Sequence, residues 1–480
     1  MIKSYRFLIL GIALVAGCAL PPATHMPQPR AAPDLGIVAD PTPLPKPGSW
    51  PSSEWWRQFA LPELDRIEAH ALRRNPSLAI AASRVRAAEA LVDARAAASR
   101  PRLGAEAATD TVRFSEHGTH GPLNGRSLTI GILHPLALRW HLDLWQRDAA
   151  ALAAAGAEQQ AQAAASAEAR LLVSAALART YFALAATEMQ LAEARALQRN
   201  AEARLVLAKT RFGAGLGTDQ AVQQQSEQVA AHETTVIALQ DLATVLRHAL
   251  AALAGEGPAW GASITVPARL PSPALGLPAD LPLDWVAHRP DVTVARWRVE
   301  ARSQGIRAAR AAFYPDINLR AFTGWESISL ADLVNPANAV YALGPAVHLP
   351  LFEGGRLRAD LRAREAEYAM AVAAYDDAVL GAAQDVADAL TRWQSAGESL
   401  AVQQRALAAA KRTLSLESGR AAAGLVPRDA VLAADDAARQ AQLRQITMTT
   451  AQLDAAADLL TALGGGFTDP QLESHRDRSQ

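Results

Sequence analysis

The chain lacks the features that mark several common functional classes. It has one cysteine in 480 residues, which excludes a disulfide framework and a cysteine-rich metal site. Lysine and arginine number 47 against 48 for aspartate and glutamate, so the basic surplus of a nucleic-acid-binding protein is missing. After the N-terminus, no uninterrupted apolar run reaches the roughly 18–20 residues of a membrane helix. This argues against an α-helical transporter.

Patterns typical of catalysis are also missing. The eleven histidines, including His117 and His120, show no metal-ligand spacing. No glycine-rich phosphate loop follows a strand pattern, and the three glycines at 464–466 are better explained as a helix stop. We therefore expect a protein that is not an enzyme and has no metal or soluble cofactor.

The N-terminus has the pattern of a secretory signal. Lys3 and Arg6 precede the apolar run 7–16, and small residues lead to the lone Cys18. This predicts a lipoprotein signal peptide over 1–17, cleavage before Cys18, and a covalent diacylglycerol and N-acyl lipid on that cysteine. Ala19 favours the outer membrane as destination. The alternative is an ordinary signal followed by a chance cysteine.

Proline is unevenly distributed. Ten of the 28 prolines lie between Pro21 and Pro51, which predicts an extended tether. Proline is then absent from 136–257 and from 351–426. An uninterrupted helix of about 70 residues would be roughly 100 Å long, at 1.5 Å per residue. Such lengths indicate coiled-coil-like helices.

A seven-residue repeat supports this prediction, because it keeps one seam of each helix facing a neighbour. The first column is interrupted once, at Gln198, and the second is uninterrupted. The columns are Leu177, Leu184, Leu191, Leu205 and Phe212, and then Val372, Val379, Val386, Trp393, Leu400, Leu407 and Leu414. A soluble coiled coil would explain the heptads equally well.

The chain is an internal duplicate. The pair Asn75-Pro76 corresponds to Arg289-Pro290 at an offset of 214, as does Arg100-Pro101 to Tyr314-Pro315. The motif from Arg211 to Leu216 corresponds to that from Arg420 to Leu425 at an offset of 209. The five-residue difference in length therefore lies between Pro101 and Arg147.

The segments 101–139 and 315–350 carry a strand signal. An imperfect alternation runs over about ten positions, enough for a tilted strand to cross a bilayer. It sets Ile317, Leu319, Ala321, Thr323 and Trp325 against Asp316, Asn318, Arg320 and Phe322. Each segment is predicted to be a hairpin, so each chain offers four strands. Four strands cannot close, and an open sheet edge is costly in lipid, so several chains must join; three would give twelve strands. A soluble β-hairpin is the alternative.

Several short motifs are specific enough to suggest a family. They are Arg289-Pro290-Asp291, the run Ala308 to Pro315, the run Leu351 to Arg356, and the closing run Ala462 to Phe467. In these motifs the sequence resembles the TolC-like outer-membrane efflux factors, in the lipoprotein branch that includes the OprM and NodT groups. The resemblance covers nearly the whole chain after Cys18. The segment Trp140 to Arg147 is similar to the family's WELDLFGR, but departs from it at His141, Trp145 and Gln146. The glycine missing there leaves the local strand-to-helix turn in question.

This resemblance implies a mainly α fold with a membrane β part. It would be a homotrimer with a twelve-stranded barrel in the outer membrane and an α-helical barrel in the periplasm. It would work with a periplasmic adaptor protein and an inner-membrane pump of the RND type. The segments expected are the signal 1–17, tether 18–61, helix 62–100, hairpin 101–139, long helices 140–253, linker 254–282, helix 283–313, hairpin 314–350, long helices 351–463 and tail 464–480.

The candidate working residues lie at the turns between the long helices. Gly215, Leu216, Gly424 and Leu425 are expected to contact the adaptor, because in the family this region engages adaptor hairpins. The alternative is that these glycines serve only to form the tight turn between two helices. Family members narrow the nearby aperture with acidic rings, but Ala433 stands where relatives commonly have aspartate. Substitutes near the two turns, which could equally be solvated or capping residues, are Asp219, Arg428, Asp429, Asp435 and Asp436.

The expected function is a passive outer-membrane channel of a tripartite efflux pump that exports drugs or other toxic small molecules. Two alternatives stay open. One is a conduit for secreted polypeptides. The other is a lipid-anchored periplasmic coiled-coil scaffold with soluble hairpins.

Overall fold

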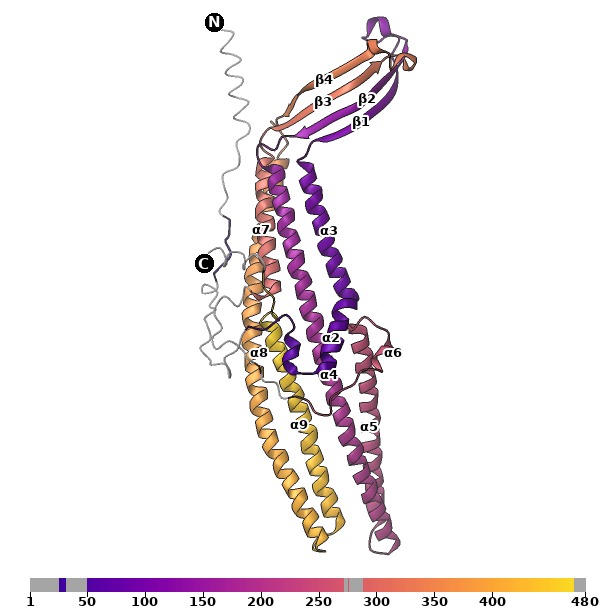
Figure 1. Cartoon of the computed structure of the whole chain (residues 1–480), viewed down its shortest axis with the longest axis vertical. Coiled ribbons are helices and arrows are strands. Elements are labelled where there is room, and N and C mark those ends of the chain that lie inside the picture. Colours follow the sequence, from indigo (N-terminus) through magenta and orange to yellow (C-terminus); the bar gives the residue numbers. More distant parts are fainter. Residues whose placement is uncertain (1–25, 32–49, 272–274, 276–287, 470–480) are drawn as a thin grey trace. The chain divides into compact units, whose positions relative to one another are not determined.

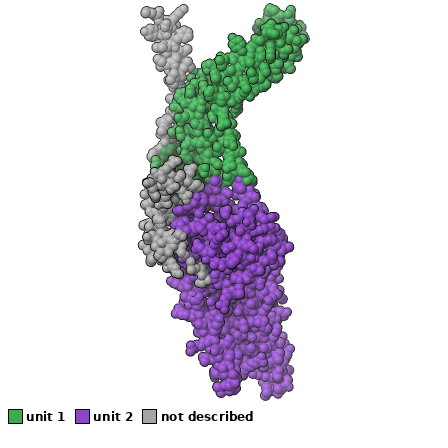
Figure 2. Space-filling view, viewed as in Figure 1, with its two compact units in different colours: residues 1–29, 84–162, 295–375 green, residues 30–83, 163–294, 376–480 purple. Residues whose placement is uncertain are grey.

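The structure is a computed structural model that describes residues 26–31, 50–271, 275 and 288–469. Cys18, the signal 1–17, most of the expected tether, and residues 272–274 and 276–282 of the expected linker therefore lie outside the described residues. The chain divides into two compact units (Figure 2). Unit 1 consists of residues 1–29, 84–162 and 295–375, and unit 2 of residues 30–83, 163–294 and 376–480.

The helices repeat in matched pairs, as the duplication predicts. The first copy contains α4 (Arg147–Gly213, 67 residues) and α5 (Asp219–Leu253, 35 residues). The second contains α8 (Arg356–Ala422) and α9 (Arg428–Ala462), of the same two lengths. Each pair forms a long hairpin (Figure 1). These helices lack internal proline and are rich in alanine, which favours uninterrupted helix.

The heptad columns are the buried seams of α4 and α8. All residues of the second column from Val372 to Leu407 are at most 8% exposed, and Leu414 is half-buried. In the first column Leu177 and Leu184 are fully buried, whereas Phe212 is 48% exposed. Burial within one chain therefore falls toward the turns.

The shorter helices differ from expectation. The helix expected over 62–100 is two helices, α2 (Pro62–Arg74) and α3 (Pro76–Ala98), because Pro76 removes a backbone donor. In the second copy α7 spans Pro290–Ala311. Within the ranges expected to be tether and linker, η2 (Trp55–Phe59) and α6 (Pro258–Gly261) are helical. Trp55 and Phe59 are each 1% exposed, so this part of the expected tether belongs to the core of unit 2.

The strands of unit 1 form one antiparallel sheet in the order β1-β2-β3-β4 (Figure 1). Their bounds are β1 Arg102–Arg113, β2 Ser127–His141, β3 Asp316–Ser327 and β4 Ala339–His348. Three short 3-10 helices lie in the two hairpin connections, η3 (Gly121–Leu123), η5 (Leu330–Asp332) and η6 (Pro336–Asn338). Strand β2 has 15 residues and its counterpart β4 has 10. This five-residue difference lies between Pro101 and Arg147, where the offset between the two copies changes from 214 to 209.

Two helices contain apolar windows as long as a membrane span, although the sequence has no uninterrupted apolar run of that length after the N-terminus. Helices α4 and α5 each contain an 18-residue window, with mean hydropathy 1.3 and 1.4 respectively, apolar enough for a membrane span by length and composition alone. Within the structure 50% and 22% of these windows are buried. The mean hydropathy of a window rich in alanine and leucine stays high even when polar residues interrupt it. The whole of α4 is about 100 Å long, three times the thickness of a bilayer core.

Candidate functional site

Both turns between the long helices have the same backbone geometry. Gly215 and Gly424 adopt φ of 72° and 71°, in the left-handed region that glycine enters without steric cost. The next amide, of Leu216 or Leu425, donates to the carbonyl of Arg211 (2.8 Å) or Arg420 (2.9 Å). This is a Schellman cap, which satisfies the last carbonyls of α4 and α8.

The caps leave a leucine exposed on each turn. Leu216 is 80% exposed and Leu425 70% exposed. Single exposed apolar residues are common on protein surfaces. Here, however, the same residue is exposed at equivalent positions of two repeats, on a rigid helical turn. Such a pair is suited to contact another protein chain.

Next to the turns, α4 and α9 are joined by a polar network. Asn200 donates to Asp435 (2.7 Å) and Asp436 (2.8 Å), and Arg204 pairs with Asp436 (2.7 Å) and Asp429 (3.3 Å). Arg439 extends the network, linking Asp435 (2.8 Å) to Glu193 on α4 (2.9 Å). Although burial opposes it, hydrogen bonds from Asn200 and Arg439 lower the pKa of Asp435. The network therefore contains ionised carboxylates and ties α9 to α4.

The five candidate aperture residues fall into two groups according to their contacts. Asp429, Asp435 and Asp436 belong to the network. Asp219 instead lies in the first turn of α5 and accepts from Gln223 (3.3 Å), and Arg428 has no hydrogen bond or ion pair within the described residues. The basic partners, Arg204 and Arg439, were missed by sequence reasoning. Sequence alone does not say which faces of two distant helices meet.

The sheet has one strongly apolar face. Strand register places Leu103, Leu138, Ala321 and Leu343 side by side across the four strands. The large apolar side chains exposed on this face are Leu103, Leu136, Trp140, Tyr341, Leu343 and Val347, with Tyr341 87% exposed. An exposed apolar surface of this kind marks an interaction site or a membrane.

The opposite face is charged. It includes Arg102, Arg139 and Arg320, which are direct cross-strand partners, and Glu106, which accepts from Arg139 (2.6 Å). Further along, His134 stacks on Phe322 (ring centroids 4.2 Å apart) and contacts Glu326 (3.2 Å). The alternation of β3 predicted from sequence thus extends across the whole sheet.

A bulge interrupts β2 at His134 and Pro135. The register slips between Leu133 and Leu136, because Pro135 has no amide to donate to the ladder. Opposite the bulge, a Cβ on Gly324 would collide with the carbonyl of Leu133. Glycine at 324 therefore allows β3 to approach the bulged strand.

The turn from β2 into α4 forms without the family's glycine. Gln146 itself adopts φ 59°, as the equivalent Gly355 does at 88° in the second copy. Both carboxylate oxygens of Asp143 accept from the first amides of α4, those of Asp148 (3.1 Å) and Ala149 (2.8 Å). Trp145 stacks on Tyr314 and holds this turn against β3. The departure from the family pattern therefore leaves the turn intact.

His141, Asp143 and Asp148 have ligand atoms within 4.8 Å of one another, as a metal site would require. Each of them is already engaged. His141 contacts Asp148 (2.6 Å) through Nδ1 and Asp316 (3.3 Å) through Nε2, while Asp143 caps α4. These contacts explain the cluster as a junction between β2, β3 and α4.

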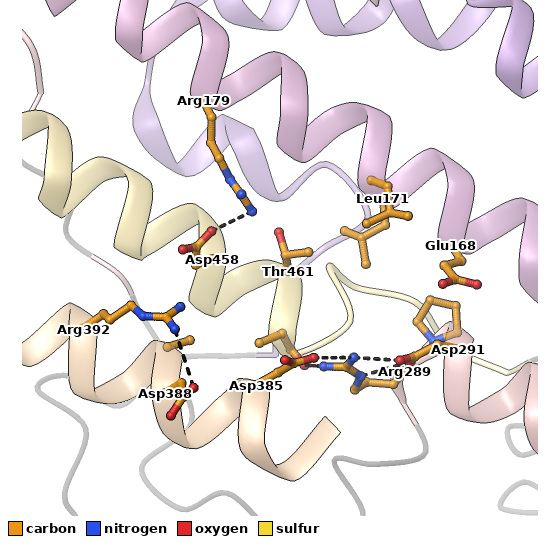
Figure 3. Close-up of a pocket in the computed structure, with 14 residues that line it drawn as sticks. Glu168, Leu171, Arg179, Arg289, Asp291, Asp385, Asp388, Arg392, Asp458 and Thr461 are labelled. Atoms are coloured by element: carbon orange, nitrogen blue, oxygen red, sulfur yellow. Dashed lines mark hydrogen bonds and ion pairs between the residues drawn. The ribbon is translucent and has the colours of Figure 1, made fainter. Parts of the chain in front are cut away.

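A cavity of about 320 Å³ in unit 2 is lined by ion pairs (Figure 3). Arg289 pairs with Asp291 (2.7 Å) and Asp385 (3.0 Å), and Arg179 pairs with Asp458 (2.6 Å). Arg289 also donates to the carbonyl of Ala462 at the end of α9 (3.0 Å). Arg289 thus fixes the start of α7 to α8 and α9, and Arg179 joins α4 to α9.

Comparison with known proteins agrees with this architecture. The sequence profile described as "Outer membrane efflux protein" matches twice, at residues 69–256 and 281–465, which confirms the duplication. The chain is 30% identical over 467 residues to the multidrug resistance outer membrane protein MdtQ of Escherichia coli O157:H7, covering 95% of this chain and 96% of that protein. It is 34% identical over 321 residues to the fusaric acid resistance protein FusA of Burkholderia cepacia, covering 66% of this chain and 60% of that protein.

A solved structure gives the same answer. The outer membrane protein VceC of Vibrio cholerae matches with a TM-score of 0.77 and 31% identity, covering 87% of this chain and 100% of VceC. The tandem long helices and the four-stranded sheet are thus a TolC-like channel fold, as the resemblance implied. The chain belongs to the outer membrane efflux protein family.

Proposed function

We propose that the chain forms a homotrimer that acts as the passive outer-membrane conduit of a tripartite efflux pump. Three sheets would close into a twelve-stranded barrel in the membrane. The long helices would extend into the periplasm as an α-helical barrel. Cargo would be drugs or other toxic small molecules, with the energy supplied by the pump.

The two-faced sheet carries this proposal. Its apolar face is fully suited to lipid, with Trp140 and Tyr341 on it, and aromatic residues are enriched at membrane interfaces. Its edge strands β1 and β4 have no further partner among the described residues. In lipid each unpaired backbone group costs several kcal/mol, so such edges must pair with those of sister chains. A soluble scaffold would gain nothing from this exposed apolar face.

The turns would dock the periplasmic adaptor. Leu216 and Leu425, held by Gly215 and Gly424, offer apolar contacts at matched positions, which suits an adaptor that binds both repeats in a similar way. The adaptor would join the conduit to an inner-membrane pump, of the RND type in the family resemblance.

The α4–α9 network would set the resting aperture. Asp429 and Asp435, both on α9, contact Arg204 and Asn200 on α4, so their role would be to hold α9 against α4. Asp219 and Arg428, outside the network and without an ion pair among the described residues, would face the aperture, and threefold symmetry would multiply each charge by three. Opening of the aperture would require the ion pairs between α4 and α9 to break and the side chains to find other partners.

The lipid on Cys18 would add a second attachment to the outer membrane. The chain would have no chemistry of its own. The names of its relatives, multidrug resistance and fusaric acid resistance, support small molecules over polypeptides as cargo.

Deleting the gene tests this function. We expect the deletion strain to become sensitive to a set of antibiotics, detergents or organic acids, and the wild-type gene on a plasmid to restore resistance. Loss of a secreted polypeptide with unchanged sensitivity would favour the secretion conduit. No change in either would contradict both channel functions.

A further inference from the structure

The charged face of the sheet has an unbalanced row of positive charge. Arg102 on β1 is the register partner of Arg139 on β2, and Arg139 is the partner of Arg320 on β3. Direct cross-strand partners on one face lie about 5 Å apart, and like charges at this distance destabilise a sheet. We call these three residues the arginine row. A sheet that needed only stability would not hold such a row.

Nearby acids balance only part of the row. Arg139 pairs with Glu106 (2.6 Å), whereas Arg102 and Arg320 have no ion pair within the described residues. The nearest acid on β3 below the row, Asp316, is engaged by His141 and by Asn318. Within the row itself, two of the three arginines per chain are therefore unpaired; the other strand acids on this face, Asp110 and Glu326, lie further along β1 and β3.

Closure of the barrel would not neutralise the row. The register continues from Arg320 to Gly344 on β4, and β4 contains no acidic residue. In a trimer the β4 edge of one chain would pair with the β1 edge of the next, so it would bring no carboxylate beside Arg102. Three chains would present six unpaired arginines at this level of the lumen.

We propose that the arginine row is an anion-attracting site in the barrel lumen, which favours the passage of small organic anions such as carboxylates. This rests on the proposed function, since it requires the charged face to line the lumen. Arginine rings are the usual device of pores that select anions. Guanidinium groups also bind carboxylates in a planar, bidentate geometry.

The local potential can be measured with a thiol on this face. Ala137→Cys places a cysteine two residues from Arg139 along β2, on the same face as the row and between Gly104 and Phe322. The only natural cysteine is Cys18, which is acylated in the mature protein under the proposed lipidation, so the new thiol would be the reactive one. Purified protein in lipid nanodiscs is treated with a sulfonate-bearing and a trimethylammonium-bearing methanethiosulfonate, and the two rates are compared.

We expect the anionic reagent to be favoured by about tenfold relative to the same cysteine with Arg102, Arg139 and Arg320 changed to Gln, and the preference to fall with added salt. Arg139→Lys should keep the preference, because it keeps the charge. Arg102→Gln alone, which breaks no ion pair, should reduce it measurably. A ratio of the two rates that the three Gln substitutions leave unchanged would overturn the arginine-row proposal.

A neighbouring cysteine tests the barrel separately. Leu138→Cys lies on the apolar face of the same strand, opposite Leu103 and Ala321. If that face lies in lipid, neither water-soluble reagent should label it. Labelling as rapid as at position 137 would contradict the proposed function, whereas labelling at 137 alone without charge preference would contradict only the anion site.

Discussion

Asn75 and Arg289 make the same contact in the two copies of the repeat. The Asn75 amide donates to the carbonyl of Leu253 at the end of α5 (2.8 Å), and the Arg289 guanidinium donates to the carbonyl of Ala462 at the end of α9 (3.0 Å). Each residue precedes the proline that opens the next helix. Two chemically different side chains thus join the end of one helix to the start of another.

Removing either side chain should destabilise the fold. We expect Asn75→Ala to cost about 1–2 kcal/mol, since it also loses the cap on the amides of Ser77 and Leu78. Arg289→Ala should cost about 2–3 kcal/mol, because Asp291 and Asp385 lose their partner. Denaturant unfolding followed by circular dichroism measures both. Ser77→Ala and Arg298→Ala, at exposed neighbouring positions, should stay near wild type, and equal losses in these controls would contradict the assignment.

Stability should depend on pH through Glu68 in α2. Its side chain is fully buried, and burial raises the pKa of Glu68 to about 9, although Ser174 and Arg170 favour the charged form. The folded state therefore holds a proton that the unfolded state releases near pH 4.5. The contribution of Glu68 to the free energy of unfolding should be greatest below pH 4.5 and fall by up to about 1.4 kcal/mol per pH unit toward pH 9.

Glu68→Gln should remove this slope and stabilise the protein at pH 8, because glutamine is always neutral. Thermal unfolding of wild type and variant at pH 5 and pH 8 compares the two. The same pH dependence in both proteins would show that Glu68 does not contribute.

Charges on the turns should abolish adaptor binding without unfolding the chain. Leu216→Asp and Leu425→Asp change exposed side chains that support no core, so the circular dichroism spectrum should be unchanged. Adaptor capture from detergent extracts, and resistance of the complemented deletion strain, should fall at least about tenfold for the double variant. Val334→Asp in the β3–β4 connection is 62% exposed and serves as the matched control. Normal capture of the adaptor by the double variant would show that the adaptor does not bind at these two leucines.

Loosening the α4–α9 network should widen the aperture. Arg204→Ala removes two ion pairs at once and leaves Asp436 held only by Asn200. We expect the single-channel conductance of this variant to rise severalfold. Arg392→Ala is the control, since its partner Asp388 lies on the same helix. An unchanged conductance in Arg204→Ala would show that the network does not limit the flow of ions.

Sequence patterns predicted the repeated elements well and their contacts poorly. Heptads such as Val372 to Leu407 and the alternation from Ile317 to Trp325 are periodic, and periodicity follows directly from helix and strand geometry. The break at Asn75 and the buried η2 were missed, since one proline or a few tryptophans carry no period. The pairing of Arg204 with Asp436 and the arginine row depend on which elements become neighbours, which only the tertiary structure supplies.

The most direct test is the state of the purified protein in lipid. Native mass spectrometry and planar-bilayer recording of one preparation give the number of chains and the conductance together. The account predicts three chains, each acylated at Cys18, and discrete ion-conducting events whose size depends on Arg204. A monomer that leaves the bilayer insulating, with its sheet accessible to water on both faces, would contradict it.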